Sequence, residues 1–413
     1  MKKRLASILI LAMAGTMILG GCGGNGGGDD GKTSDGKAKI RFATWDEAED
    51  VDTQQEMVDR FNEAHDDIEV TLEAYGGEFD TKIAAGMGSK DAPDVMYMWN
   101  YPAYANGLEE LDSYIDKEGA DYKANFYDTL WNYNSLNGKT YGIPVGFTTH
   151  ALFYNKAIFK EAQIEEPTDD WTWDDLIKAA KTITEKCEGK KGFSFQMKPD
   201  PYDFEMYLWS NGTAYCDDEG NLEGNLNSKE AKEVFQMFQD MEEEGYAVAT
   251  EKSGGDEFRA GSTGMYIYGS WAIDSLNEAE MDWGVVKIPS FAGKGPSASI
   301  LSSSGLSISK DSKNKEAAWE FIKYWTSEEL NTERIGSEQP VLYSVVEAEK
   351  MMEKPEYAPF YEMLEQSGDY TPASFKVERW SELAENLSLT FEEVFNPSSM
   401  ADVSDSLDTA ADQ

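Results

Sequence analysis

The stretch "KIRFATWDEAEDVDTQQEMVDRFNEAHDDIEVTLEAYGGEFDTKIAAGMGSKDAPDVMYMW", residues 39–99, alternates strand-like and helix-like segments. Three segments have the alternating or continuous apolar pattern of strands: residues 39–45, 68–75 and 94–99. Between them, residues 52–65 place apolar side chains on one helical face, and residues 78–88 form a shorter helix that ends at glycine. Strands that alternate with helices in this way predict a parallel sheet with helices on its faces.

Two of these predicted strands end in a tryptophan followed by polar side chains. Trp45 precedes Asp46 and Glu47, and Trp99 precedes Asn100. Ligands of parallel α/β sheets bind beyond the carboxyl ends of the strands. We therefore expect these residues to face a crevice. In the alternative interpretation, the tryptophans cover the core.

The pattern of strands and helices continues beyond this stretch. A helix is predicted to start near Thr172 in "TWDDLIKAAKTIT", because threonine is a good N-cap residue. Another predicted strand, "GMYIYG" at residues 264–269, is also followed by a tryptophan, Trp271. A chain of 413 residues is long enough for two or more domains.

The N-terminus has the pattern of a targeting segment. Residues 1–21 combine three basic residues with an apolar run, as in a signal peptide, and end in "LGGC". A cysteine at this place matches the bacterial lipobox, in which Cys22 would carry the lipid. Residues 22–38 are rich in glycine and aspartate, which predicts a flexible tether. We expect a chain that is exported and anchored at Cys22.

The composition argues against several classes of function. The formal net charge is −42, with 78 acidic and 36 basic residues, whereas a nucleic-acid-binding protein needs basic surfaces. Only two histidines are present, and no spacing resembles a zinc site, so neither a metal nor a cofactor is expected. Cys187 and Cys216 could pair in an oxidising compartment, but their spacing does not decide this.

Nine motifs in order resemble the extracellular solute-binding proteins of carbohydrate ABC importers, the group that includes maltose-binding protein. These motifs are "LGGC", "FNEAHDDIEVTLE", "KDAPDVMYMW", "GLEELDSYI", "GKTYGIPVGFTTHALFYNK", "TWDDLIKAAKTIT", "FRAGSTGMYIYGSWAI", "WGVVKIPSFAGKG" and "NKEAAWEFIKYWTSEE". After the lipobox, the resemblance extends from residue 39 to about residue 384. It implies an α/β fold of the two-lobed periplasmic-binding-protein type (type II), with a ligand cleft between lobes that close about a hinge.

The resemblance also implies boundaries and partners. The chain would cross between the lobes near Gly146, Leu301 and Val346. Lobe 1 would hold residues 39–147 and 302–345, and lobe 2 residues 148–300 and 350–413. The implied partners are an oligosaccharide ligand and the permease subunits of an ABC transporter at the outer face of a bacterial cytoplasmic membrane. A monomer is implied, with no nucleic-acid partner.

Family positions that contact sugar match ten residues of this chain. They are Trp45, Asp46, Glu47, Trp99, Asn100, Asp200, Tyr202, Trp271, Arg379 and Trp380. After "IPVG" the chain departs from the maltose-binding pattern, because Thr148, Thr149 or His150 stands where a carboxylate is expected. That departure argues against malto-oligosaccharide as the ligand.

The chemistry of these residue types suits a neutral sugar. A flat aromatic covers the C–H face of a sugar ring, and carboxylate, amide and guanidinium groups pair with its hydroxyls. We expect an affinity in the micromolar range, about −8 kcal/mol. Two other classes stay open at this point: a secreted glycoside hydrolase, which also uses carboxylates, and a cell-surface adhesin.

Overall fold

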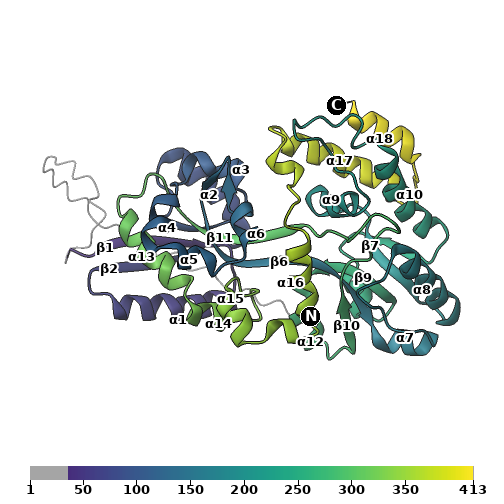
Figure 1. The fold of residues 1–413 in the computed structure, drawn as a ribbon, viewed down its shortest axis with the longest axis horizontal. Coiled ribbons are helices and arrows are strands. Elements are labelled where there is room, and N and C mark those ends of the chain that lie inside the picture. The colour runs from purple at the N-terminus through teal and green to yellow at the C-terminus, as the bar shows by residue number, and fades with distance from the viewer. Residues whose placement is uncertain (1–35, 413) are drawn as a thin grey trace, which may run out of the picture.

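The computed structural model describes residues 36–412 and divides them between two α/β lobes (Figure 1). The predicted signal peptide, Cys22 and most of the predicted tether lie outside the described residues. Within residues 36–412, no helix combines the length and the apolar character that a membrane span requires. Cys187 and Cys216 are both buried and free, so they do not form a disulfide.

One continuous sheet runs through both lobes in the strand order β2-β1-β3-β11-β6-β9-β7-β8, with β10 also paired to β6. The first lobe contributes β1 (Ala38–Thr44), β2 (Ile68–Ala74), β3 (Val95–Met98) and β11 (Leu301–Ile308). The second contributes β7 (Lys191–Gln196), β8 (Ala247–Thr250), β9 (Thr263–Gly269) and β10 (Trp283–Val286). The strand β6 (Ile143–Asn155) belongs to both, and β4 (Ser135–Leu136) and β5 (Lys139–Thr140) form a separate hairpin.

Helices cover the sheet in each lobe. In lobe 1 they are α1 (Glu49–Ala64), α2 (Phe79–Ser89), α3 (Tyr101–Tyr104), α4 (Asp112–Glu118), α5 (Ala120–Ala124), α6 (Asp128–Tyr133), α13 (Lys315–Trp325), α14 (Glu328–Glu333) and α15 (Tyr343–Ala348). In lobe 2 they are α7 (Lys156–Ala162), α8 (Trp173–Lys186), α9 (Pro201–Ser210), α10 (Lys229–Glu243), α11 (Gly255–Arg259), α12 (Ala272–Glu278), α17 (Trp380–Phe395) and α18 (Val403–Ala411). The remaining helix, α16 (Ala358–Gln366), lies against β6 between the lobes.

The predicted strand–helix alternation of residues 39–99 is confirmed. β1 pairs in parallel with both β2 and β3, and all four residues of β3 are buried. The first helix begins earlier than expected, at Glu49, so Asp52 lies inside it. The helix expected near Thr172 starts there with a capping box between Thr172 and Asp175.

The strand β6 connects the lobes mechanically. Its first half pairs with β11, from Ile143 to Thr149, and its second half pairs with β9 and β10. All thirteen of its residues are buried. Thr149 donates its hydroxyl to the Phe360 carbonyl of α16 at 2.7 Å, so α16 covers one face of β6. The opposite face, at Gly146 and Thr148, is free to line a cavity.

Each lobe has its own core. Buried apolar residues of lobe 1 lie within residues 40–147 and 306–364, and those of lobe 2 within 152–300 and 363–411. Met351 and Tyr361 belong to the lobe 1 core, so the segment after residue 350 packs partly on lobe 1 rather than on lobe 2, where the resemblance puts it. The division 39–147 plus 302–345 and 148–300 plus 350–413 stays a prediction.

Candidate functional site

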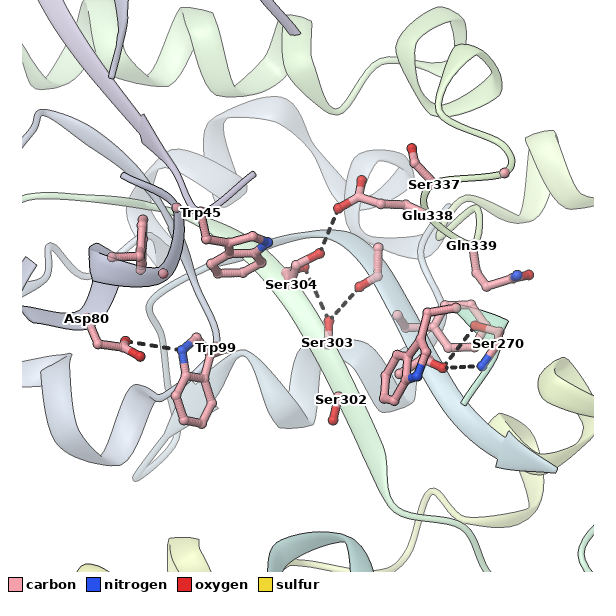
Figure 2. Close-up of a pocket in the computed structure, with 18 residues that line it drawn as sticks. Trp45, Asp80, Trp99, Ser270, Ser302, Ser303, Ser304, Ser337, Glu338 and Gln339 are labelled. Atoms are coloured by element: carbon pink, nitrogen blue, oxygen red, sulfur yellow. Dashed lines mark hydrogen bonds between the residues drawn. The ribbon is translucent and has the colours of Figure 1, made fainter. Parts of the chain in front are cut away.

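A cavity of about 490 Å³ opens between the two lobes, against β6 and β11 (Figure 2). Its lining comes from both lobes and from the loop after α14. The residues that line it are Trp45, Gly76, Gly77, Phe79, Asp80, Trp99, Gly146, Phe147, Thr148, Ser270, Trp271, Ser302, Ser303, Ser304, Gly336, Ser337, Glu338 and Gln339. It joins apolar walls of aromatic rings to a floor of hydroxyl groups.

Two tryptophans form the lobe 1 wall, as the strand ends predict. Trp45 follows β1 and is half-buried, because its ring packs on Phe79 and Tyr97 at centroid distances of 5.3 and 4.9 Å. Trp99 follows β3 and leaves 44% of its surface exposed. Its indole Nε1 donates to Asp80 Oδ1 at 3.3 Å, which fixes the ring at the cavity edge (Figure 2).

Trp271 supplies the aromatic wall on lobe 2. It follows β9, is 49% exposed, and meets the Tyr268 ring edge-on at 5.3 Å. The indole lies so close to Gly269 that a Cβ there would meet ring carbon Cζ2 at 2.7 Å. Glycine at position 269 is therefore what allows the ring to lie over the end of β9.

The floor of the cavity consists of small hydroxyl residues from the two connecting strands. The hydroxyls of Thr148 and Ser270 lie 2.9 Å apart, which ties β6 to the end of β9. Ser303 donates to the Gly146 carbonyl at 3.1 Å, and Ser304 donates to Glu338 Oε1 at the same distance. Serine side chains keep the floor low, so a ring-sized ligand has room above it.

An ion pair borders the floor, and its carboxylate, Glu338, lines the cavity. Arg334 is 5% exposed, and its Nε lies 3.0 Å from Glu338 Oε2. Burial raises the pKa of the Glu338 carboxyl, while the Arg334 guanidinium opposes that shift. Gly146 makes room for this pair, since a Cβ there would come within 2.9 Å of the Glu338 side chain.

The acidic residues expected beside Trp45 have structural partners. Asp46 Oδ2 accepts from the Thr44 hydroxyl at 2.8 Å and from Gln54 Nε2, and burial raises its pKa. Asp46 lines a neighbouring cavity rather than the large one. Glu47 accepts from the Gly77 backbone N–H at 2.9 Å and so holds the loop that precedes α2.

Three other predicted residues also have local roles in this structure. The Asn100 side chain caps α3 through the Ala103 N–H, and Asp200 caps α9 through the Tyr202 N–H. Tyr202 donates to the Leu301 carbonyl at 2.6 Å and packs on the cores of both lobes. None of these three lines the large cavity.

The C-terminal pair also lies outside it. Arg379 forms an ion pair with Glu382 on the exposed first turn of α17, and Trp380 packs on the lobe 2 core. The structure therefore brings Trp45, Trp99 and Trp271 to one cavity and leaves the other seven predicted residues off its lining. Their contact with ligand stays a prediction.

Sequence reasoning missed the polar half of the cavity. Asp80 lies on α2, and Glu338 and Gln339 lie on a loop far along the chain, where nothing local marks them. The run Ser302–Ser304 lies in a strand of small residues, and this pattern was the signal that could have predicted the polar floor of the cavity. Of the three residues at the departure from the maltose pattern, only Thr148 lines the cavity.

The described residues show no metal centre. Within residues 36–412, no three or more His, Cys, Asp or Glu side chains lie together in a way that could hold a metal ion. The cavity thus offers aromatic faces, hydroxyls and the carboxylates of Asp80 and Glu338. Such a lining suits a polar ligand with apolar faces.

Residues 44–332 match the sequence model of a family described as bacterial extracellular solute-binding protein. A putative binding protein of Brucella abortus is 28% identical over 255 residues, and this match spans 59% of the chain and only 60% of the relative. An arabinooligosaccharide-binding protein of Bacillus subtilis is 24% identical over 386 residues, covering 88% of the chain and 86% of the relative.

The fold has close counterparts among solved structures. An ABC substrate-binding protein of Listeria monocytogenes, in complex with cycloalternan, matches with a TM-score of 0.77 and 24% identity. The match covers 91% of this chain and 97% of that chain. The two-lobed α/β fold implied by the sequence motifs is thereby confirmed.

Proposed function

The chain belongs to the bacterial extracellular solute-binding proteins, and from the aromatic cavity between its lobes we propose that it captures a sugar, of oligosaccharide length, for an ABC importer. The observation that supports this most is the opposition of Trp99 on lobe 1 and Trp271 on lobe 2, each nearly half exposed beside one cavity. Large aromatics left in water beside a polar cleft are typical of binding sites.

The floor and walls divide the recognition of a sugar between them. The indole faces cover C–H surfaces, while Ser302, Ser304 and Asp80 offer hydroxyl and carboxylate partners for the rim of the ring. A cavity of about 490 Å³ has the size of a small-molecule site. The similarity to a relative named as an arabinooligosaccharide-binding protein supports the same ligand class.

Delivery and anchoring complete the proposal. The ligand-bound, closed form docks on permease subunits at the outer face of the cytoplasmic membrane, and the lipid on Cys22 keeps the monomer there. The lipobox pattern supports the anchor. Seven residues that are predicted to contact sugar lie off the lining of the large cavity, and in the proposal they reach the sugar in the closed form. They include Asn100, Asp200, Tyr202, Arg379 and Trp380.

A screen by isothermal titration calorimetry tests the ligand class. Neutral oligosaccharides of several linkages should bind with affinities in the micromolar range, about −8 kcal/mol. Phosphorylated sugars and peptides serve as the comparison set. Binding confined to that set would overturn the proposal.

The same screen separates binding from hydrolysis. Chromatography of each sugar after long incubation should recover it intact, as a binding protein requires. Cleaved product would favour the glycoside hydrolase. Retention of intact cells on immobilised polysaccharide, with no soluble sugar bound, would favour the adhesin.

Replacing the lipidated cysteine tests the anchor. Cys22→Ser should move the protein from the membrane fraction to the soluble fraction, because a lipidated cysteine with two or more chains gives stable attachment. Sugar affinity should stay as in the parent, since Cys22 is not among the residues that line the cavity. A mutant that still sediments with membranes would show that Cys22 is not the attachment point.

A further inference from the structure

A second cavity continues the large one past Trp271. It measures about 250 Å³ and shares Trp271, Gly336, Ser337 and Glu338 with its neighbour. The other residues that line it are Asp46, Asp50, Thr53, Gln54 and Met57 of lobe 1, Asp274 of α12, and Arg334. Because both lobes contribute, this extension is a part of the cleft with its own chemistry.

Negative charge dominates the extension. Four carboxylates line it, and the guanidinium of Arg334 is already paired with Glu338. Asp46, Asp50 and Asp274 form no ion pair with any described residue. Asp50 on α1 and Asp274 on α12 belong to different lobes. Burial raises the pKa of Asp274, and the charges of Glu278 and, to a smaller extent, Asp50 add to that shift. Like charges therefore oppose each other across this end of the cleft.

Two buried polar atoms in the same cavity lack partners among the described residues. Gln54 is 6% exposed, and its Oε1 accepts no hydrogen bond, while its Nε2 is held by Asp46. Arg334 Nη2 likewise donates to nothing. A buried polar group without a partner is unfavourable, so each atom favours a ligand that pairs with it.

We propose that this extension binds a positively charged amino group carried by the end of the sugar ligand, so that the chain takes amino-sugar oligosaccharides. The ammonium lies among Asp46, Asp50 and Asp274 and donates to Gln54 Oε1. A neighbouring hydroxyl of the same ring accepts from Arg334 Nη2. This inference rests on the proposed sugar-binding function and names its substrate class.

The charges also connect the ammonium to closure of the lobes. With the extension empty, Asp50 and Asp274 repel each other as the lobes approach. A cation between them turns that repulsion into attraction from both sides. A metal ion does not fit the same role, because the described residues offer no cluster that could hold one.

Three β-1,4-linked tetrasaccharides of equal length test the proposal: the glucosamine tetramer, its fully N-acetylated form and cellotetraose. They differ only in an amine, an acetamide or a hydroxyl at C2. We expect calorimetry to show the amine form binding about 10- to 100-fold more tightly than the other two, since hydrogen bonds to charged groups are the stronger ones. The preference should shrink at about 0.5 M salt, where charges are screened.

Substitutions of single aspartates test whether the tighter binding of the amine form depends on the extension. Asp50→Asn and Asp274→Asn should each lower the affinity for the glucosamine tetramer about 10-fold. Asp52→Asn is the control, since this exposed residue also lies on α1 and the change in charge is the same, but it lines neither cavity. Circular dichroism checks that each variant is folded.

The outcomes separate this inference from the function on which it rests. If neutral oligosaccharides bind and amino-sugar forms bind equally or more weakly, the inference is wrong and the sugar-binding function stands. An amine preference that survives both aspartate substitutions would place the ammonium elsewhere and also overturn it. If no sugar of any class binds, the proposed function fails and the inference fails with it.

Discussion

Trp99 and Trp271 keep nearly half of their surfaces in water, although large aromatics contribute most to stability when they are buried. Trp45 differs from them, because its ring packs on Phe79 and Tyr97 and serves the core and the cavity together. The strand-end position predicted that Trp45 and Trp99 face a crevice, and the family resemblance added Trp271 to the predicted site. The sequence did not show that the Trp45 ring also packs in the core of lobe 1.

Replacing Trp99 with alanine separates binding from stability. Trp99→Ala should weaken sugar binding by about 1.5–3 kcal/mol, roughly 10- to 100-fold, because the stacking face is lost. The free energy of unfolding should change little, since the ring is 44% exposed and makes one hydrogen bond, to Asp80. Titration calorimetry and urea unfolding of the same preparation measure the two quantities.

Trp45→Ala is the comparison variant. Its half-buried ring packs on two core aromatics, so it should lose stability as well as affinity. If Trp99→Ala instead lowers stability by the ~3–5 kcal/mol of a core substitution and leaves affinity unaltered, Trp99 does not belong to the site.

Residues that line the cavity could be predicted where they follow a recognisable strand. They could not be predicted where only the folding of distant segments brings them to the cavity. Trp45, Trp99 and Trp271 each end a recognisable strand. Glu338 reaches the cavity because α14 returns the chain to β6, and no pattern near Glu338 announces that return. Glu47 and Asn100 follow strand ends too, but their side chains are used for a loop and a helix cap.

Among the elements, α9 carries an unusual feature, a carboxylate in its buried middle. Glu205 is 1% exposed and accepts from the Ala373 backbone N–H at 2.8 Å, and burial raises its pKa to about 7. It thus links α9 to the segment before α17. The carboxylate is not neutralised by an ion pair with any described residue.

The stability of the fold should therefore depend on pH through Glu205. Its folded pKa lies above the unfolded value near 4.5, so the folded state holds the proton more tightly. The contribution to stability is complete below about pH 4.5 and is lost as pH rises to about 7, by up to about 3 kcal/mol. Urea unfolding at a series of pH values measures this loss.

Glu205→Gln isolates that contribution. The amide stays neutral at every pH, so the decline between pH 4.5 and 7 should be smaller than in the parent. Asp203, whose pKa burial also raises to about 7, remains in both proteins and contributes to the residual slope. Identical pH profiles for the parent and the variant would contradict the assignment.

The sequence predicted where a helix begins only when a side-chain cap was recognisable in it. The capping box at Thr172 and Asp175 starts α8 where it was expected. The first helix starts at Glu49 without a side-chain cap, three residues before the range 52–65 that the apolar pattern predicts. The long strand β6 could not be predicted as one element, because its two halves belong to different lobes and only tertiary pairing makes them continuous.

For the whole molecule, the two cores and the shared strands imply two bodies that move about a narrow connection. A ligand shifts the balance between open and closed forms only by binding one of them better. Trp99 and Trp271 lie on different lobes, so a sugar that touches both binds the closed form better. The two-lobed fold was accessible from the order of the nine motifs, whereas the path of α16 across the lobe boundary was not.

Small-angle X-ray scattering tests closure directly. Saturating sugar should lower the radius of gyration of the protein, because the lobes approach each other around the ligand. Trp271→Ala should require more sugar for the same change, since one of the two bridging contacts is gone. An unchanged radius of gyration at saturation, with binding verified by calorimetry, would rule out closure as the response to ligand.

The order of strands in lobe 1 has a consequence for how the chain is assembled. β11 lies between β3 and β6, and its residues Gly305–Ile308 pair with Val95–Met98, which are synthesised far earlier. The first lobe therefore cannot complete its sheet until residue 308 is available, and by then most of lobe 2 has been made as well. Contacts between such distant residues form slowly, because a long loop must close before any pairing is gained. The connectivity thus keeps the sheet of lobe 1 incomplete until most of the chain has been made, and such a delay would suit the location outside the cytoplasmic membrane that is proposed above.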